Sequence, residues 1–173
     1  MRKIIEFPVS YKDACDHLRV EEGDDTSIIN RFIKAATSLT ENYVEFDIAL
    51  SEYTVTGTTV SGYIPVKASS FRSVKSVKIN GTPVSDSDWE VINIRDYEYT
   101  VDIKLDISAE STYEIVYKTG FASSECDESI RTAIFLKLGE LYDIDRSNYT
   151  TNTYKTTSQF ERILNFHKKP LFR

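Results

Sequence analysis

Glycine is scarce in this chain, and the glycine-rich loops that bind phosphate groups are missing. Only six glycines occur among 173 residues, and neither GxxxxGK[ST] nor GxGxxG is present. Such loops need closely spaced glycines because their backbone amides must approach the phosphates directly. The GxSxG turn that presents a nucleophilic serine is missing as well. These absences argue against a nucleotide-binding protein and against a serine hydrolase.

Histidine and cysteine are also sparse, which leaves few ligands for a metal ion. His17 and His167 stand near opposite ends, and neither has a partner at the spacing of metal sites. Cys15 and Cys126 form no CxxC pair; a disulfide is possible in principle, but two reduced thiols are the expected state. The acidic run Glu21–Asp25 lacks the alternating ligands of an EF-hand and is interpreted as a charged turn with a helix cap. The sequence therefore predicts no cofactor, no metal site and no catalytic residue.

Long apolar runs are absent too. None approaches the roughly 18 residues that a membrane-spanning helix needs. The apolar part of the N-terminal sequence Met1–Pro8 is too short for a signal peptide. We therefore expect cytoplasmic synthesis and no association with a membrane.

What is present is the composition of an ordinary globular protein, with 40% hydrophobic and 28% charged residues. Helical patterns occur in three places. Ser10 is a suitable N-cap for a helix over residues 10–18. Apolar residues at steps of three and four predict a longer helix over about 25–48, and a third over about 128–145 with Asp127 as its cap.

Between the second and third helices, residues 52–119 are rich in Val, Ile, Thr and Tyr, which favour strands. The pattern predicts five to seven antiparallel strands, and Asn80-Gly81 is the strongest hairpin signal. The predicted fold class is α+β. The N-terminal helices and the third helix pack together, the antiparallel β block is inserted between them, and an extended C-terminal arm follows.

The C-terminal arm, residues 146–173, differs in charge from the body of the chain, residues 1–145. It holds six of the 21 basic residues and only one of the 27 acidic ones, so a body of about −11 carries an arm of about +5. The arm begins with a polar stretch, and its second half is both apolar and basic. Such a segment suits binding to an acidic partner better than catalysis.

Several short motifs occur in the order seen in the head–tail connector, or adaptor, proteins of tailed bacteriophages. The segment Pro8–Val20, which ends in HLRV, resembles the opening of these proteins and is followed by the acidic turn and the long helix. Within the β block, Ile64-Pro65 and the SVKSV sequence at 73–77 resemble the family's strands. Tyr117–Phe121 resembles the family's strand ending, and the final Leu171-Phe172-Arg173 resembles its C-terminus.

This resemblance implies a structural virion protein without enzymatic activity, located in the neck between capsid and tail. Such proteins form a homo-oligomeric ring, commonly of twelve subunits, beneath the portal protein. They extend the channel through which genomic DNA passes without sequence-specific binding, and they contact a stopper or tail-completion protein. Two alternatives stay open: another neck or tail-completion protein, which should lack the two N-terminal helices, and a small enzyme.

The resemblance also implies that the C-terminal arm docks on the portal. The residues expected to do so are the apolar and basic ones of its second half: Phe160, Arg162, Ile163, Leu164, Phe166, Lys168, Lys169, Leu171 and Phe172. The alternative for the apolar members is that they pack back on their own domain.

Overall fold

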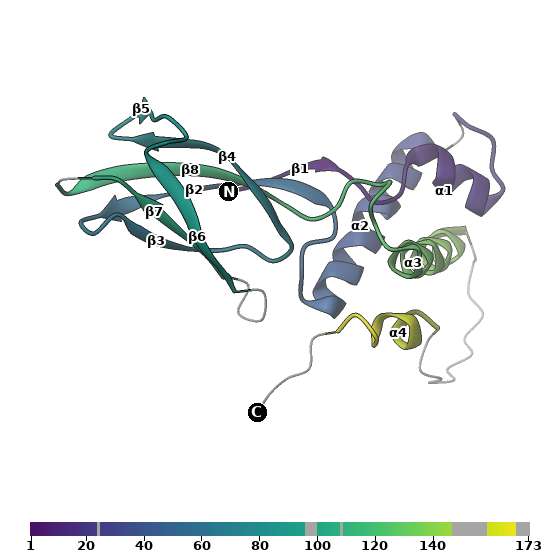
Figure 1. Cartoon of the computed structure of the whole chain (residues 1–173). Helices are drawn as coiled ribbons and strands as arrows, with labels where there is room; N and C mark the ends of the chain where they lie inside the picture. Colours follow the sequence, from purple (N-terminus) through teal and green to yellow (C-terminus); the bar gives the residue numbers. More distant parts are fainter. Residues whose placement is uncertain (24, 96–99, 108, 147–158, 169–173) are drawn as a thin grey trace. The chain divides into compact units, whose positions relative to one another are not determined.

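The computed structural model describes residues 1–23, 25–95, 100–107, 109–146 and 159–168. The chain forms two compact units (Figure 1). The β unit comprises Met1–Glu6 and Ala49–Gly120, and the helical unit comprises Phe7–Ile48 and Phe121–Arg173. The chain therefore crosses from one unit to the other three times. Each unit has its own hydrophobic core.

The first helix of the helical unit, α1 (Tyr11–Leu18), begins at the cap that the sequence predicts. The Ser10 hydroxyl accepts from the Asp13 amide at 3.1 Å, and the Asp13 carboxylate accepts in return from the Ser10 amide at 3.4 Å. This reciprocal pair satisfies two amides that the first helical turn leaves without partners. The helix ends at Arg19, whose backbone is left-handed.

The long helix α2 (Thr26–Val44) differs from the prediction at both ends. Asp25 precedes the helix with a φ of +48° and makes no side-chain cap bond, so the helix cap predicted in the acidic turn is wrong. Its carboxylate instead accepts from the Tyr142 hydroxyl at 3.2 Å. At the other end a left-handed Glu45 stops the helix, which is therefore shorter than predicted.

Two further helices complete this unit. The helix α3 (Glu128–Arg146) lies where the sequence predicts it, and its start is capped by Asp127, which accepts from the Ser129 amide at 2.8 Å. A short helix, α4 (Gln159–Leu164), forms within the predicted arm and packs on α3 and α2. The buried residues of all four helices and their connections form one core: Val9, Ala14, Cys15, Ile29, Phe32, Ile33, Ala36, Val44, Ile48, Cys126, Ile130, Ala133, Ile134, Leu138, Tyr142, Phe160 and Leu164.

The β unit contains two antiparallel sheets. The strands are β1 (Arg2–Glu6), β2 (Leu50–Thr59), β3 (Tyr63–Lys67), β4 (Phe71–Ile79), β5 (Thr82–Pro83), β6 (Trp89–Arg95), β7 (Thr100–Leu105) and β8 (Ser111–Thr119). One sheet has the order β1-β2-β8-β4-β5 and the other β3-β7-β6. Buried residues of both sheets belong to one core, to which β8 contributes Ile115 and Tyr117 and β7 contributes Ile103.

Local sequence signals in the β unit are used as predicted. Asn80 and Gly81 have φ of +51° and +78° and connect β4 to β5, which confirms the hairpin. Pro65 and Pro83 lie in β3 and β5, which are edge strands, where a missing backbone donor costs no ladder bond. The α+β fold with a β block between helices is therefore confirmed. Among the described residues, no helix is both long and apolar enough to span a membrane.

Candidate docking segment and the search for a catalytic site

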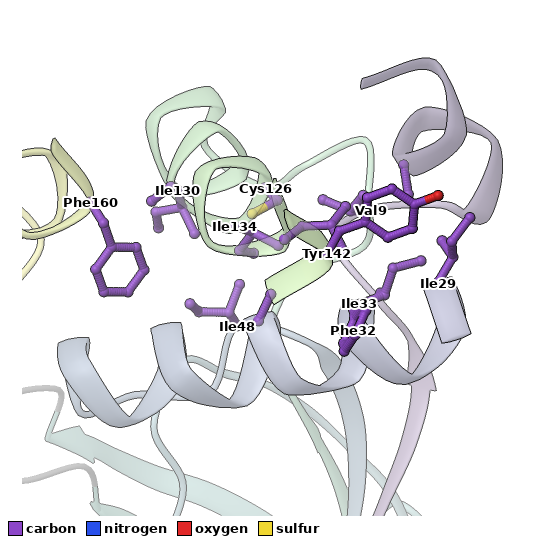
Figure 2. Close-up of a cluster of buried hydrophobic side chains, with 14 of the residues drawn as sticks. Val9, Ile29, Phe32, Ile33, Ile48, Cys126, Ile130, Ile134, Tyr142 and Phe160 are labelled. Atoms are coloured by element: carbon purple, nitrogen blue, oxygen red, sulfur yellow. The ribbon is translucent and has the colours of Figure 1, made fainter. Parts of the chain in front are cut away.

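The described part of the predicted arm, residues 159–168, is held on the helical unit by two buried side chains. Phe160 and Leu164 lie one helical turn apart on α4, and Leu164 is completely buried. The Phe160 and Tyr43 rings pack edge to face with their centres 5.6 Å apart. The Lys137 ammonium lies 4.8 Å from the centre of the Phe160 ring. Figure 2 shows Phe160 extending from α4 into the cluster that includes Ile48 and Ile130. These two side chains are therefore part of the core of the unit.

Polar contacts fix the residues that follow α4. The Tyr43 hydroxyl donates to Asn165 Oδ1 at 2.7 Å, and the Lys168 ammonium lies 5.0 Å from the centre of the same Tyr43 ring. His167 Nε2 lies 2.5 Å from Ser129 Oγ at the start of α3. The segment is thus attached to α2 through Tyr43 and to α3 through Ser129. The sequence alone identifies neither residue as a contact of the arm, because a local pattern does not indicate a partner more than 30 residues away.

The other predicted docking residues are distributed between surface and interior. Phe166 is 91% exposed, and Arg162 and Lys168 are exposed on the same short segment. Ile163 is half-buried against the core of the helical unit. An almost fully exposed phenylalanine on a short segment with two exposed cations is an unusual surface feature, because large apolar side chains are mostly covered. Three of the predicted docking residues lie outside the described part of the chain: Lys169, Leu171 and Phe172.

Ser129, His167 and Asp127 resemble a hydrolytic triad only in composition. In such a triad the carboxylate holds the imidazole nitrogen opposite the one that faces the serine. Here Asp127 Oδ1 accepts directly from Ser129 Oγ and lies 3.8 Å from His167 Nε2, the nitrogen that faces the serine. The hydrogen bonds from the Ser129 hydroxyl and amide lower the pKa of Asp127. The cluster caps α3 and anchors the C-terminal segment.

The remaining candidates for chemistry also have structural partners. His17 stacks on Phe135 with ring centres 4.8 Å apart. Cys15 and Cys126 are free and buried, which confirms the expectation of two thiols. Burial raises the pKa of Cys126 to about 11, so its thiol is protonated at neutral pH. Within the described part of the chain, no three His, Cys, Asp or Glu side chains are placed to hold a metal ion.

A polar hollow of about 340 Å³ lies at one end of the three-stranded sheet of the β unit. Its lining residues are Ser87, Asp88, Trp89, Glu90, Lys104 and Asp106. Lys104 lies 3.5 Å from Glu90, and the Asp106 amide donates to the Asp88 carbonyl at 2.8 Å. One ion pair and one backbone hydrogen bond thus cross the hollow, and the lining residues show no nucleophile–base pair.

Comparison with known proteins finds similar folds among solved structures only. No protein-family model matches the sequence, and no curated protein matches it. Among solved structures, a chain from the neck of the empty gene transfer agent (GTA) particle, computed with C6 symmetry, matches with a TM-score of 0.66 and 13% identity. That match covers 100% of this chain and 97% of the other.

Two further solved structures give the same result. A chain from the virion of the native gene transfer agent particle matches with a TM-score of 0.65 and 14% identity, and one from the neck of the native particle, computed with C12 symmetry, with 0.63 and 13%. Both matches cover 99% of this chain and 97% of the other. At this identity the likeness establishes a shared fold over the whole length of both chains.

Proposed function

We propose that this protein is a structural component of the neck of a phage-like particle, and within the neck the head–tail connector that forms a ring beneath the portal. The observation that carries the proposal is the likeness over the full length, both units included, to chains of a particle neck. A fold alone does not define a function. Here, however, it agrees with the ordered sequence motifs that resemble connector proteins. The symmetric description of those necks fits a ring of identical subunits.

The N-terminal helices favour the connector over another neck protein. A tail terminator or stopper should have the β block without two preceding helices, whereas α1 and α2 are both present and contribute to the main core. The enzyme alternative has less support, because Ser129 and His167 belong to the cluster that caps α3, His17 stacks on Phe135, and both cysteines are buried.

The charge of the helical unit suits a channel for DNA. Without the arm, its two segments carry six basic and fifteen acidic residues. Phosphate binding needs clustered Lys and Arg, and an acidic surface repels the DNA backbone instead. In this proposal the helical unit contributes an acidic surface along which DNA slides without being retained.

The C-terminal segment is proposed to dock on the portal through its exposed residues. Phe166 supplies an apolar anchor, and Arg162 and Lys168 supply positive charge around it. An aromatic side chain with basic neighbours fits an apolar pocket with an acidic rim. Lys169, Leu171 and Phe172 extend the same chemistry in sequence. Phe160 and Leu164 would hold the segment on the helical unit through their burial in its core.

The test is assembly on the isolated portal ring of the same particle, observed by negative-stain electron microscopy. We expect an added ring on the portal, and none on the tail tube. The triple variant Phe166→Ser, Arg162→Glu, Lys168→Glu should abolish the added ring while the core residues Phe160 and Leu164 stay intact. The matched control is Val60→Ser with Lys67→Glu, two exposed positions in the β unit. Binding to the tail tube instead of the portal would contradict the connector role.

A further inference from the structure

The outer face of the five-stranded sheet carries a group of lysines gathered around two glutamates. Lys3 on β1 and Lys118 on β8 are both in register with Glu52 on β2, so the three side chains lie on one face. Lys75 on β4 reaches across β8 to Glu52 at 2.7 Å. Lys78 on β4 forms an ion pair with Glu114 on β8, and the two charged atoms are 2.7 Å apart. We call these six residues the lysine face.

Positive charge exceeds negative charge on the lysine face, which has four lysines and two glutamates. Glu52 is the central carboxylate, and the hydrogen bond from Lys75 lowers its pKa, with Lys118 and Lys3 contributing further. Lys3 is exposed, and the Lys75 and Lys78 side chains are 51% and 40% exposed. The strands β1, β2, β8 and β4 thus present a broad polar surface with a net charge of about +2.

One end of the helical unit has the opposite charge. In the sequence, residues 10–25 contain six acids and two bases. Lys12 lies 3.2 Å from Asp16 and 3.6 Å from Glu22, and both carboxylates remain more than half exposed. Arg131 joins this region to the start of α3, because it lies 3.4 Å from Asp13 and 2.7 Å from Glu128. We call the carboxylates of Asp13, Asp16, Glu21, Glu22 and Glu128 the acidic end.

A closed ring needs two different patches on every subunit. In a head-to-tail interface, one patch of each copy contacts the other patch of its neighbour, and the ring closes when every patch is used. Complementary charge is one means by which such patches select each other and fix their register. The lysine face and the acidic end are two patches of opposite sign, and they belong to different units.

We infer that the lysine face of one copy binds the acidic end of the next copy, and that this contact is a ring interface. The inference rests on the proposed function, since it presumes a ring. DNA is the other polyanion that a lysine face could meet. The two interleaved glutamates, each engaged with a lysine, favour a protein surface of mixed charge over a continuous row of phosphates.

Charge exchange between the two patches tests this inference. Variant A carries Lys3→Glu and Lys118→Glu, and variant B carries Asp16→Lys and Glu22→Lys. Each alone should weaken ring assembly about tenfold or more, because like charges then face each other. A mixture of A and B should assemble into a ring in which the two alternate, since each reversed patch meets a complementary one. Native mass spectrometry, of the free protein and of the protein bound to the portal, measures how many A and B subunits each ring contains.

The control for a general charge effect is Lys34→Glu with Lys67→Glu, two exposed lysines outside the lysine face, which should assemble like the natural chain. If circular dichroism shows that variant A is unfolded, the neutral pair Lys3→Gln and Lys118→Gln replaces it, with a smaller expected loss. Unchanged assembly of folded A and B overturns the inference and leaves the proposed function standing. Loss of duplex DNA binding in A with unchanged assembly also overturns it, in favour of DNA. Absence of any ring from the natural chain overturns the proposed function itself.

Discussion

The β unit and the helical unit carry their charges in different ways. The β unit has nine basic and eleven acidic residues, so it is nearly neutral. The helical unit without the arm has a net charge of about −9, and the basic segment that follows α3 packs on this same unit through α4. Almost all of the net negative charge outside the arm therefore belongs to the helical unit. The difference teaches that the arm partly neutralises the unit to which it is attached, whereas the β unit balances its charges within its own sheets.

The units also differ in what holds them together. Cross-strand ladders and one shared core stabilise the β unit, in which neighbours in a sheet can be far apart in sequence. The helical unit instead depends on caps, on buried apolar stripes and on single contacts such as that between Tyr43 and Asn165. Each of these features can be removed separately, which allows the two units to be compared by mutation.

The largest expected effect comes from deleting buried side chains in each core. Leu138→Ala in α3 and Ile115→Ala in β8 each remove a fully buried aliphatic group and should cost about 2–5 kcal/mol of folding free energy. Hydrogen exchange should locate the loss. Amides of α2 and α3 should lose protection in the first variant, and amides of β2 and β8 in the second. Leu39→Ala, at a position 44% exposed, is the control. Equal loss in both units from either variant would show that they unfold as one.

The next effect separates the two phenylalanines of the C-terminal segment. Phe160→Ala should cost up to about 3 kcal/mol, because the ring is 6% exposed and its loss leaves a cavity against Tyr43. Phe166→Ala should leave the melting temperature unchanged and should weaken attachment to the portal. Thermal denaturation and portal binding together distinguish the roles. A stability loss in Phe166→Ala as large as that in Phe160→Ala would contradict the assignment of one to the core and the other to the surface.

A smaller effect is expected where the chain leaves the helical unit for the β unit. The buried Glu41 carboxylate accepts from the Ile48 amide at 2.9 Å. Glu41→Ala would leave that amide without an acceptor and should cost about 1–3 kcal/mol in chemical denaturation. Glu41→Gln keeps an acceptor oxygen and should cost less. Equal destabilisation of the two variants would show that Glu41 stabilises the fold through its charge and not through this hydrogen bond.

Local signals in the sequence predict much of this fold, and distant pairings account for most of what they miss. Ser10, Asp127 and Asn80-Gly81 act where the sequence places them, because caps and turns depend on a few adjacent residues. The separation into two sheets was not predicted, since the period of a strand carries no information about its partner. The helix α4 was missed because six residues are too few for a reliable period, although Phe160 and Leu164 already had helical spacing.

The candidate site was predicted less completely than the fold. Composition identified the basic and apolar residues of the C-terminal segment, but it could not separate those that face the core from those that face solvent. That separation depends on Tyr43 and Ser129, whose partners are 122 and 38 residues away. The lysine face cannot be recognised in the sequence either. Its residues come from four strands spread between Lys3 and Lys118.

The smallest effect comes from replacing a glycine with alanine, which should change the folding free energy in opposite directions in the two units. Gly81 has a φ of +78° and nothing within 4 Å of an added Cβ, so Gly81→Ala should destabilise the β unit by about 1 kcal/mol through backbone strain alone. Gly139 lies within α3, and an added Cβ would meet only His17 Nε2, at 3.9 Å. Gly139→Ala should therefore stabilise the helical unit by about 0.5–1 kcal/mol, since alanine restricts the unfolded chain and favours the helix. Chemical denaturation of both variants measures the pair. Destabilisation by Gly139→Ala would indicate that the contact between α1 and α3 is too close to accept a methyl group.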